Sequence, residues 1–465
     1  MGRIVRTGYL SINPFLCFGA VILLLFLLLV SGSFASFLLA LFIVSLGFVL
    51  AFLLSPNYKN RKESYVVLFT TFSIYLIVVI LQYLDTTVAF NAFANSDSDH
   101  YKFWLISEEG VNALSWNKIF RECIVDNAYI ENGGYYLYIK TLSYIGSHWF
   151  DGNSIALQYM GSALPGVLSS IFIYNILIHY SIDNAVKYSL WYAVLSPLAI
   201  VCFGIHRDGL IAFLYLILIY IWLSKGFNLK ILIVQAFVIV LITSLRFEHG
   251  LFASIFIILT AYFSNKKYRR ILQILILLIV VLYGRTLYFM SIDTYQTTTE
   301  YYTEFGEQAL DELNSGLGRY VYQLPTPIKQ VAQIIFVNMQ FPSWGYLENS
   351  KTIYGLFLGF YVLIIHVLWF YFFVYSITSL FVSKLKEIPS IILVSLAVYF
   401  LLMVLSTSSL EMRRIVCVYP CLYVFYLYLK EFSSTSRFNI RFKQVYAFSY
   451  LSISVVYFVL RTLFA

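Results

Sequence analysis

The chain contains 465 residues, of which 60% are hydrophobic and only 12% are charged. Soluble domains carry roughly 25% charged residues, and the mean hydropathy here is +0.80, so these values exclude a soluble domain of this length. The net charge of +8 would favour a nucleic-acid partner in a soluble protein. In so apolar a chain, Lys and Arg at the ends of apolar runs instead indicate membrane topology, and we expect no nucleic acid among the partners.

Apolar runs long enough to cross the hydrocarbon core of a bilayer, which is about 30 Å thick, recur along the whole chain. They predict an all-α fold, a polytopic transmembrane helical bundle of about 13 spans. The expected spans are 12–32, 33–54, 65–89, 153–179, 185–205, 209–224, 229–245, 250–264, 271–290, 353–377, 388–406, 415–429 and 446–463. The first is expected to be an anchor and not a cleaved signal peptide, because a second span follows it directly. The shorter apolar stretch 135–150 contains Lys140 and is predicted to form an interfacial or re-entrant helix.

The distribution of charge predicts the orientation of the spans, because cytoplasmic loops are rich in Lys and Arg. With the N-terminus in the cytoplasm, the cytoplasmic segments hold more than half of the 31 Lys and Arg residues. The same segments hold few of the 23 acidic residues, namely Glu63, Asp183, Glu387 and Glu431. The sequence therefore predicts a single integral membrane domain over residues 1–465. Its two long extracytoplasmic loops, with short interfacial helices, are about 90–152 and 291–352.

Asp97, Asp99 and His100 lie close together near the start of the first external loop. Two carboxylates separated by one residue can bind a hard divalent cation, Mg²⁺ or Mn²⁺, and no other motif in the chain calls for a cofactor. Alternatively, one carboxylate can be the general base that removes a proton from a sugar hydroxyl. The third interpretation is a solvated turn without a chemical role, because Asp and Ser favour turns.

Three tight external turns carry arginine, which a turn between spans does not require. The candidate phosphate-binding residues are Arg207, Arg246, Arg413 and Arg414, and the supporting residues beside them are Asp208, Glu248 and His249. The planar guanidinium group presents paired donors, so these turns would suit a lipid-linked pyrophosphate. The alternatives are anchoring to lipid headgroups, or ion pairs formed within each turn.

Several motifs resemble those of membrane glycosyltransferases of the GT-C superfamily. They are the Asp-bearing segment Ser96–Tyr101, the aromatic stretch Gly133–Tyr138, the Pro-containing span with its basic-acidic turn Ser196–Gly209, and the late Arg-then-Pro segment Arg413–Pro420. Over the whole chain, the length, the number of spans and the richness in Phe, Tyr and Ile are similar to bacterial O-antigen or capsule repeat-unit polymerases of the Wzy type.

The resemblance implies a glycosyltransferase of the bacterial inner (cytoplasmic) membrane that uses a sugar linked to polyprenyl (undecaprenyl) phosphate or pyrophosphate at the extracytoplasmic face. Its partners would then be the polyprenyl-linked saccharide, membrane lipid, a flippase and a chain-length regulator of polysaccharide biosynthesis. Asp97 or Asp99 would be the base or a metal ligand, and Arg207, Arg246 and Arg414 would hold the donor phosphates. The Arg-rich external loops of Wzy-type polymerases follow a spacing that this chain does not match, so polymerase and single-sugar transferase both stay open.

A flippase for lipid-linked oligosaccharides, or another transporter, is the alternative from a different class. Transporters hold ionisable or broken-helix sites near the bilayer midplane, often in two repeated halves. The predicted span interiors here are nearly free of charge, and the ionisable residues gather at external span ends. This distribution favours chemistry at the outer interface. An acyltransferase is disfavoured because the cytoplasmic loops offer few residues that could act on a thioester.

Overall fold

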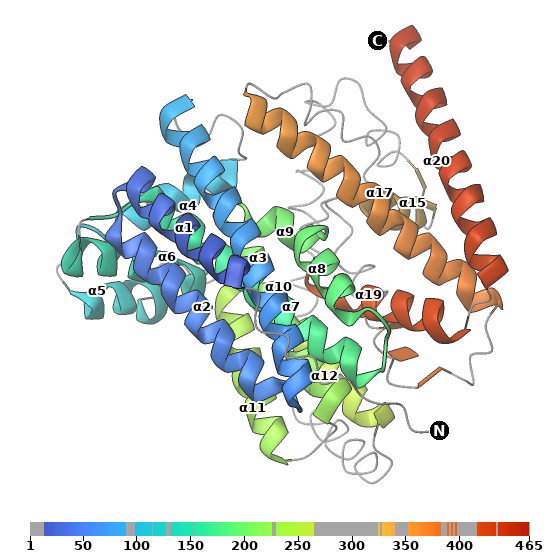
Figure 1. Cartoon of the computed structure of the whole chain (residues 1–465), viewed down its shortest axis with the longest axis horizontal. Helices are drawn as coiled ribbons and strands as arrows, with labels where there is room; N and C mark the ends of the chain where they lie inside the picture. Colours follow the sequence, from blue (N-terminus) through green and yellow to red (C-terminus); the bar gives the residue numbers. More distant parts are fainter. Residues whose placement is uncertain are drawn as a thin grey trace. The chain divides into compact units, whose positions relative to one another are not determined.

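The computed structural model describes most of the chain, and every regular element among the described residues is helical (Figure 1). The described residues are 14–89, 98–113, 115–126, 132–150, 152–225, 229–264, 324–325, 328–339, 352–382, 388–389, 392–393, 396–397, 416–433 and 436–464. No β-strand occurs among them. The predicted all-α class is therefore confirmed for the part of the chain that the structure describes.

The chain forms two compact units. The first comprises Met1–Tyr220, Val240–Phe247 and Asn349–Leu358. The second comprises Ile221–Ile239, Glu248–Glu348 and Gly359–Ala465. A boundary between the units falls inside a continuous helix, α10, so the division does not test the predicted single membrane domain.

Among the residues that the structure describes, six helical stretches are long and apolar enough to cross a membrane. They are α1 (Pro14–Ser31), α2 (Phe34–Leu54), α3 (Tyr58–Leu84) with the π-helix η1 (Asp85–Ala89), α7 (Ile155–His179), α10 (Arg207–Lys225) and α17 (Ile353–Val382). Shorter or less apolar helices in expected span regions are α11 (Leu229–Leu245), α12 (Phe247–Ser264), η6 (Val416–Val418) with α19 (Tyr419–Tyr428), and α20 (Ser436–Phe464). The chain is thus a helical membrane protein, while the count of 13 spans and their orientation stay predictions. The expected span 271–290 and most of 388–406 lie outside the described residues.

Capping residues determine where α1 ends and where α2 and α3 begin. Gly32 adopts a positive φ of 64° after α1, and its N–H donates to the Leu28 carbonyl, which ends that helix. The Ser33 side chain then accepts from the Ser36 N–H and starts α2 at once. Asn57 caps α3 in the same way. Helix α3 packs against α1, α2 and α7, which makes it central to the first unit.

Two prolines free backbone carbonyls in the first unit, and tyrosine hydroxyls satisfy both. Proline has no N–H, so the carbonyl four residues before it loses its helical partner. Pro165 lies inside α7, and the Tyr138 hydroxyl donates to the Gly161 carbonyl at 2.9 Å. Pro197 lies four residues after Ala193, whose carbonyl accepts from the Tyr75 hydroxyl, also at 2.9 Å.

The predicted span 185–205 is wrong as one continuous helix. The structure has α8 (Ala185–Val194) and α9 (Pro197–Cys202), separated at Leu195 and Ser196. The physical reason is Pro197, which cannot donate to the preceding turn and disfavours a helical conformation for the residue before it.

The first predicted external loop folds into short helices. They are α4 (Ser98–Glu108), α5 (Trp116–Phe120), the π-helix η2 (Arg121–Val125) and α6 (Gly133–Trp149). Helix α6 agrees with the helix predicted over 135–150, and it packs against α4. Lys140 of α6 is buried, and its Nζ lies 2.7 Å from the Glu109 Oε2 that follows α4. A paired carboxylate is what a buried ammonium requires.

Aromatic packing holds the second unit together. Trp369 of α17 is buried against Tyr419 and Tyr423 of α19, with ring centroids 4.8 and 5.6 Å apart. The ring centroids of Tyr371, in the same helix, and Tyr446 of α20 are 5.0 Å apart. Of the predicted second external loop, 291–352, the described helix is α15 (Ile328–Met339).

Candidate functional site

Charged residues from two predicted external turns meet in the first unit. Arg246 follows α11, and its Nη1 lies 3.9 Å from Oδ1 of Asp208, in the first turn of α10. The side chains are only 12% and 8% exposed, so both groups are largely removed from solvent. This pair joins two turns, whereas the sequence suggested pairs within each turn. The start of one helix and the end of the next lie at the same end of the unit, which brings the two charges together.

Helix α6 places an aromatic residue, Tyr135, beside these charges. Its Gly134 lies so close to Ser244 of α11 that an added Cβ would fall 2.4 Å from the Ser244 Oγ. The next residue, Tyr135, is buried. Burial raises the pKa of Tyr135 well above its ordinary value, the neighbouring Tyr138 and Asp208 raise it further, and Arg207 lowers it. Tyr135 is therefore a neutral phenol beside Arg207 and Asp208.

Two histidines lie next to one another beside the charged turn. His100 of α4 is buried, and its ring centroid lies 5.8 Å from that of His206, which directly precedes α10. Gly204 makes this approach possible, because an added Cβ would lie 2.8 Å from two atoms of the His206 ring and 3.5 Å from the His100 Nδ1. Burial lowers the pKa of His100 well below its ordinary value, and His206 lowers it further. A neutral imidazole follows, in which one ring nitrogen donates a hydrogen bond and the other accepts one.

A second group of polar residues continues from His100 through Tyr159 of α7. The rings of these two residues are 5.4 Å apart, and the Tyr159 hydroxyl lies 2.9 Å from Oγ1 of Thr86. Thr86 belongs to η1, where Asp85 is also buried. Tyr354, at the start of α17, extends the group. Its hydroxyl donates at 3.1 Å to Oε1 of Gln82, which lies near the end of α3, just before η1. A π-helical turn that carries a buried carboxylate is an arrangement frequent at functional sites.

We call this set the helix-end cluster. Its members are Asp85, His100, Tyr135, Tyr159, His206, Arg207, Asp208 and Arg246. The cluster combines two guanidinium groups, two carboxylates, two imidazoles and two phenols from several helices of one unit. Such a set can hold an anion beside the arginines and orient hydroxyl groups beside the imidazoles and carboxylates.

The predicted site residues divide between the cluster and other places. His100, Arg207, Arg246 and Asp208 all belong to it. Asp99 is half-buried in the first turn of α4, next to His100 in the chain. By contrast, His249 belongs to the second unit, where its Nδ1 lies 3.7 Å from Sγ of Cys417.

Four other predicted site residues cannot be placed. Asp97, Arg413 and Arg414 lie outside the described residues, as does the side chain of Glu248. The described residues contain no group of three or more His, Cys, Asp or Glu side chains that could hold a metal ion. A divalent cation at Asp97 and Asp99 therefore stays a prediction from the sequence.

Sequence reasoning missed four members of the cluster, one of which is His206, the residue directly before the predicted Arg207. Asp85 falls at the end of the predicted span 65–89, and a lone carboxylate at the end of an apolar run was the available signal. Tyr135 and Tyr159 are two of 40 tyrosines, and the sequence singled out Tyr135 only as part of the aromatic stretch Gly133–Tyr138, without a role at the site. Their neighbours are distant in the chain, so no local pattern distinguishes them.

Comparison with known proteins adds no assignment, since the chain matches no family model, no curated protein and no solved structure.

Proposed function

We propose that this protein is a membrane glycosyltransferase that acts at the extracytoplasmic face on sugars linked to polyprenyl phosphate or pyrophosphate. Within that class, we propose polymerisation of O-antigen or capsular repeat units, in the manner of the Wzy-type polymerases that the sequence resembles. The observation that carries the proposal is the largely buried Arg246–Asp208 pair with Arg207 beside it.

A buried arginine at a helix end is costly unless it has a function or a full set of partners. The separation of 3.9 Å between Arg246 and Asp208 is longer than a charge-assisted hydrogen bond, which is about 2.7–2.9 Å. A guanidinium group carries five N–H donors in a planar fork, so it can contact a second anion as well as Asp208. Arg207 lies at the first residue of α10, where the positive end of the helix dipole also favours a phosphate.

The other residues of the cluster are suited to orient the acceptor hydroxyl and to take up its proton. In the proposed step, an acceptor hydroxyl oxygen bonds to the anomeric carbon of the donor sugar. The bond between that carbon and the phosphate oxygen breaks, and the polyprenyl phosphate or pyrophosphate leaves with the bonding electrons. The hydroxyl proton passes to a base, for which the candidates are Asp97, Asp99 and His100 near the start of α4. Burial keeps His100 in the neutral form that can accept a proton and also makes it a weaker base than a solvated histidine, which leaves the two carboxylates as the stronger candidates.

The experiment compares Arg207→Lys and Arg246→Lys with Arg121→Lys. An ammonium keeps the charge but cannot reproduce the bidentate fork. Loss of one charge-assisted hydrogen bond of about 1.5–3 kcal/mol predicts a roughly tenfold to hundredfold loss of activity. Arg121 is the matched control, because it belongs to the same predicted external side but is 73% exposed and pairs locally with Asp126.

The measurement is the length of the polymer ladder on gels of membranes that carry each variant at equal protein abundance. We expect short or absent ladders for the two cluster variants and a parental ladder for the control. Parental ladders in all three variants would show that the arginines only anchor the helix ends. A flippase would form no new glycosidic bond, so purified protein that extends no lipid-linked acceptor would favour the alternative class.

A further inference from the structure

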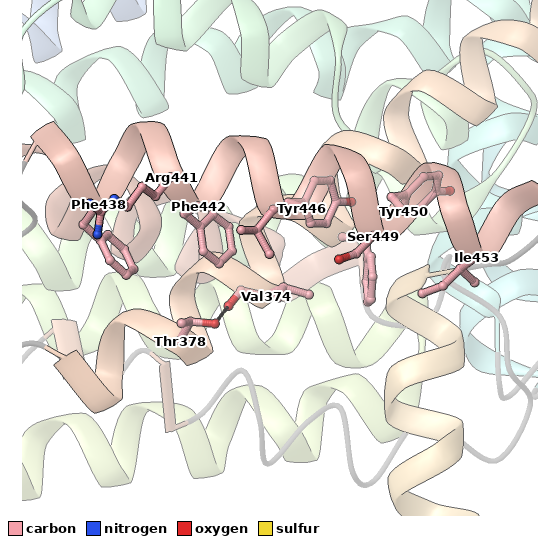
Figure 2. Close-up of a pocket in the computed structure, with 11 residues that line it drawn as sticks. Val374, Thr378, Phe438, Arg441, Phe442, Tyr446, Ser449, Tyr450 and Ile453 are labelled. Atoms are coloured by element: carbon pink, nitrogen blue, oxygen red, sulfur yellow. Dashed lines mark hydrogen bonds between the residues drawn. The ribbon is translucent and has the colours of Figure 1, made fainter.

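An aromatic groove runs between α17 and α20 in the second unit, and it has no part in the proposed reaction. Its volume is about 690 Å³, within the range of small-molecule sites. Figure 2 shows its lining as a row along α20, with Arg441 and Phe438 toward one end and Ile453 toward the other. Val374 and Thr378 of α17 lie across from this row.

Two rows of side chains, each with a spacing of four residues, build the groove. The first row is aromatic and half-buried against α17, and it consists of Phe438, Phe442, Tyr446 and Tyr450. The second row is exposed and consists of Arg441, Val445, Ser449 and Ile453. Residues four apart lie one above the other on a helix, so both rows run along its axis. The groove is thus an elongated apolar channel with one cation at its end.

We propose that this groove binds an anionic phospholipid, with the headgroup phosphate at Arg441 and an acyl chain along the two rows. Arg441 is exposed, and among the described residues no ion pair involves it. Lys443 and Arg437 lie close to it in the chain, so this end of α20 is positively charged. An anionic headgroup complements that charge, and an acyl chain complements the apolar remainder.

The length of the groove fits one leaflet of a bilayer. Ile453 lies twelve positions after Arg441, which corresponds to roughly 18 Å along a helix. Half of a hydrocarbon core is about 15 Å. The cations of this segment predict that it begins at the cytoplasmic surface, where anionic lipids attract basic residues. The ligand is therefore a lipid of the cytoplasmic leaflet, distinct from the polyprenyl donor proposed for the extracytoplasmic face.

The test is native mass spectrometry of the full chain in detergent, with phosphatidylglycerol or phosphatidylcholine of identical acyl chains as the probe. We expect the parent to retain phosphatidylglycerol at least fivefold better than phosphatidylcholine. Arg441→Gln should reduce this preference to near one. Lys443→Gln is the matched control, because this exposed cation belongs to the same helix but does not line the groove, and it should keep the preference.

A second pair of variants tests the apolar channel. Ser449→Trp fills the groove and should lower the retention of both lipids severalfold. Phe448→Trp changes the neighbouring position, which is 74% exposed and outside the groove, and should have no effect. If Ser449→Trp does not yield folded protein by gel filtration, Ser449→Leu serves the same purpose.

Equal losses in Arg441→Gln and Lys443→Gln would overturn the proposal in favour of a diffuse surface charge. Unchanged retention in the filled variant would also overturn it. Displacement of bound phosphatidylglycerol by an equal concentration of undecaprenyl phosphate would assign the groove to a polyprenyl chain instead. None of these measurements requires glycosyltransferase activity, so they stand apart from the test of the proposed function.

Discussion

The contact between His100 and His206 depends on one residue that has no side chain. Gly204 leaves no room for a Cβ, because that atom would lie 2.8 Å from the His206 ring. A contact below 3 Å forces the imidazole to move, and the movement would pass to His100, whose Nδ1 is 3.5 Å from the same point. The geometry of the two histidines is therefore sensitive to a single methyl group.

Gly204→Ala should displace the histidine pair without unfolding the protein. A displacement of about 1 Å can cost on the order of a hundredfold in rate, so we expect a roughly tenfold to hundredfold loss of activity. Polymer ladders at equal protein abundance measure the effect. Gly19→Ala in α1 is the control, because nothing lies within 4 Å of its added Cβ. A parental ladder for Gly204→Ala would exclude the histidine pair from the reaction.

At the scale of helices, the two prolines explain why tyrosines from other elements enter the core. A carbonyl without a partner is costly inside a membrane protein, because the lipid supplies no donor. Tyr138 reaches the Gly161 carbonyl, and an added Cβ at Gly161 would lie 3.0 Å from its hydroxyl. Proline thus creates the unpaired acceptor, and glycine gives the tyrosine access to it. The same hydrogen bond ties α6, which carries Tyr135, to α7.

A double-mutant cycle tests this explanation. Tyr138→Phe leaves the Gly161 carbonyl without a donor, so we expect a loss of about 1–3 kcal/mol in the free energy of unfolding. In a Pro165→Ala background the restored N–H can satisfy that carbonyl, so Tyr138→Phe should then cost much less. The measurement is thermal or denaturant unfolding of the detergent-solubilised protein.

Tyr144→Phe on the same helix controls for the loss of a hydroxyl group. Among the described residues no hydrogen bond involves the Tyr144 hydroxyl, and this change should be close to neutral. Equal effects of Tyr138→Phe with and without Pro165 would show that the tyrosine stabilises the fold in another way.

For the whole molecule, the proposed reaction needs the helix-end cluster at the extracytoplasmic face, and the separately proposed lipid site needs the basic end of α20 at the cytoplasmic face. Charge distribution predicts both orientations, because the cytoplasmic side is expected to hold most Lys and Arg residues. A reporter enzyme that is active only outside the cytoplasm can measure the orientation at successive fusion points.

Fusions in the predicted external segments should be active, and those in the predicted cytoplasmic segments should be silent. The external fusion points are Asn95, Asp293 and Ser408. The cytoplasmic fusion points are Asn60, Lys267 and Phe432. Activity at Lys267 would reverse the predicted orientation there, and the proposals for both faces would have to be withdrawn.

The helical class and most of the residues worth testing could be predicted from the sequence. Long apolar runs dictate helices, because a backbone in lipid must satisfy its own hydrogen bonds. Pro197 could also have indicated the break between α8 and α9, since the absence of its N–H is a local property. The presence of arginine in a tight turn is also a local property of the sequence, and it indicated Arg207 and Arg246.

Which of these residues lie together became clear from the packing of the helices. It paired Arg246 with Asp208, brought His100 beside His206, added Asp85 through Tyr159, and assigned His249 to the other unit. The physical reason is that a membrane helix is apolar on every side, since both the lipid and the protein interior are apolar. Hydrophobic periodicity therefore does not reveal which face packs inward. The neighbours of a polar side chain at a helix end depend on contacts between helices far apart in the chain.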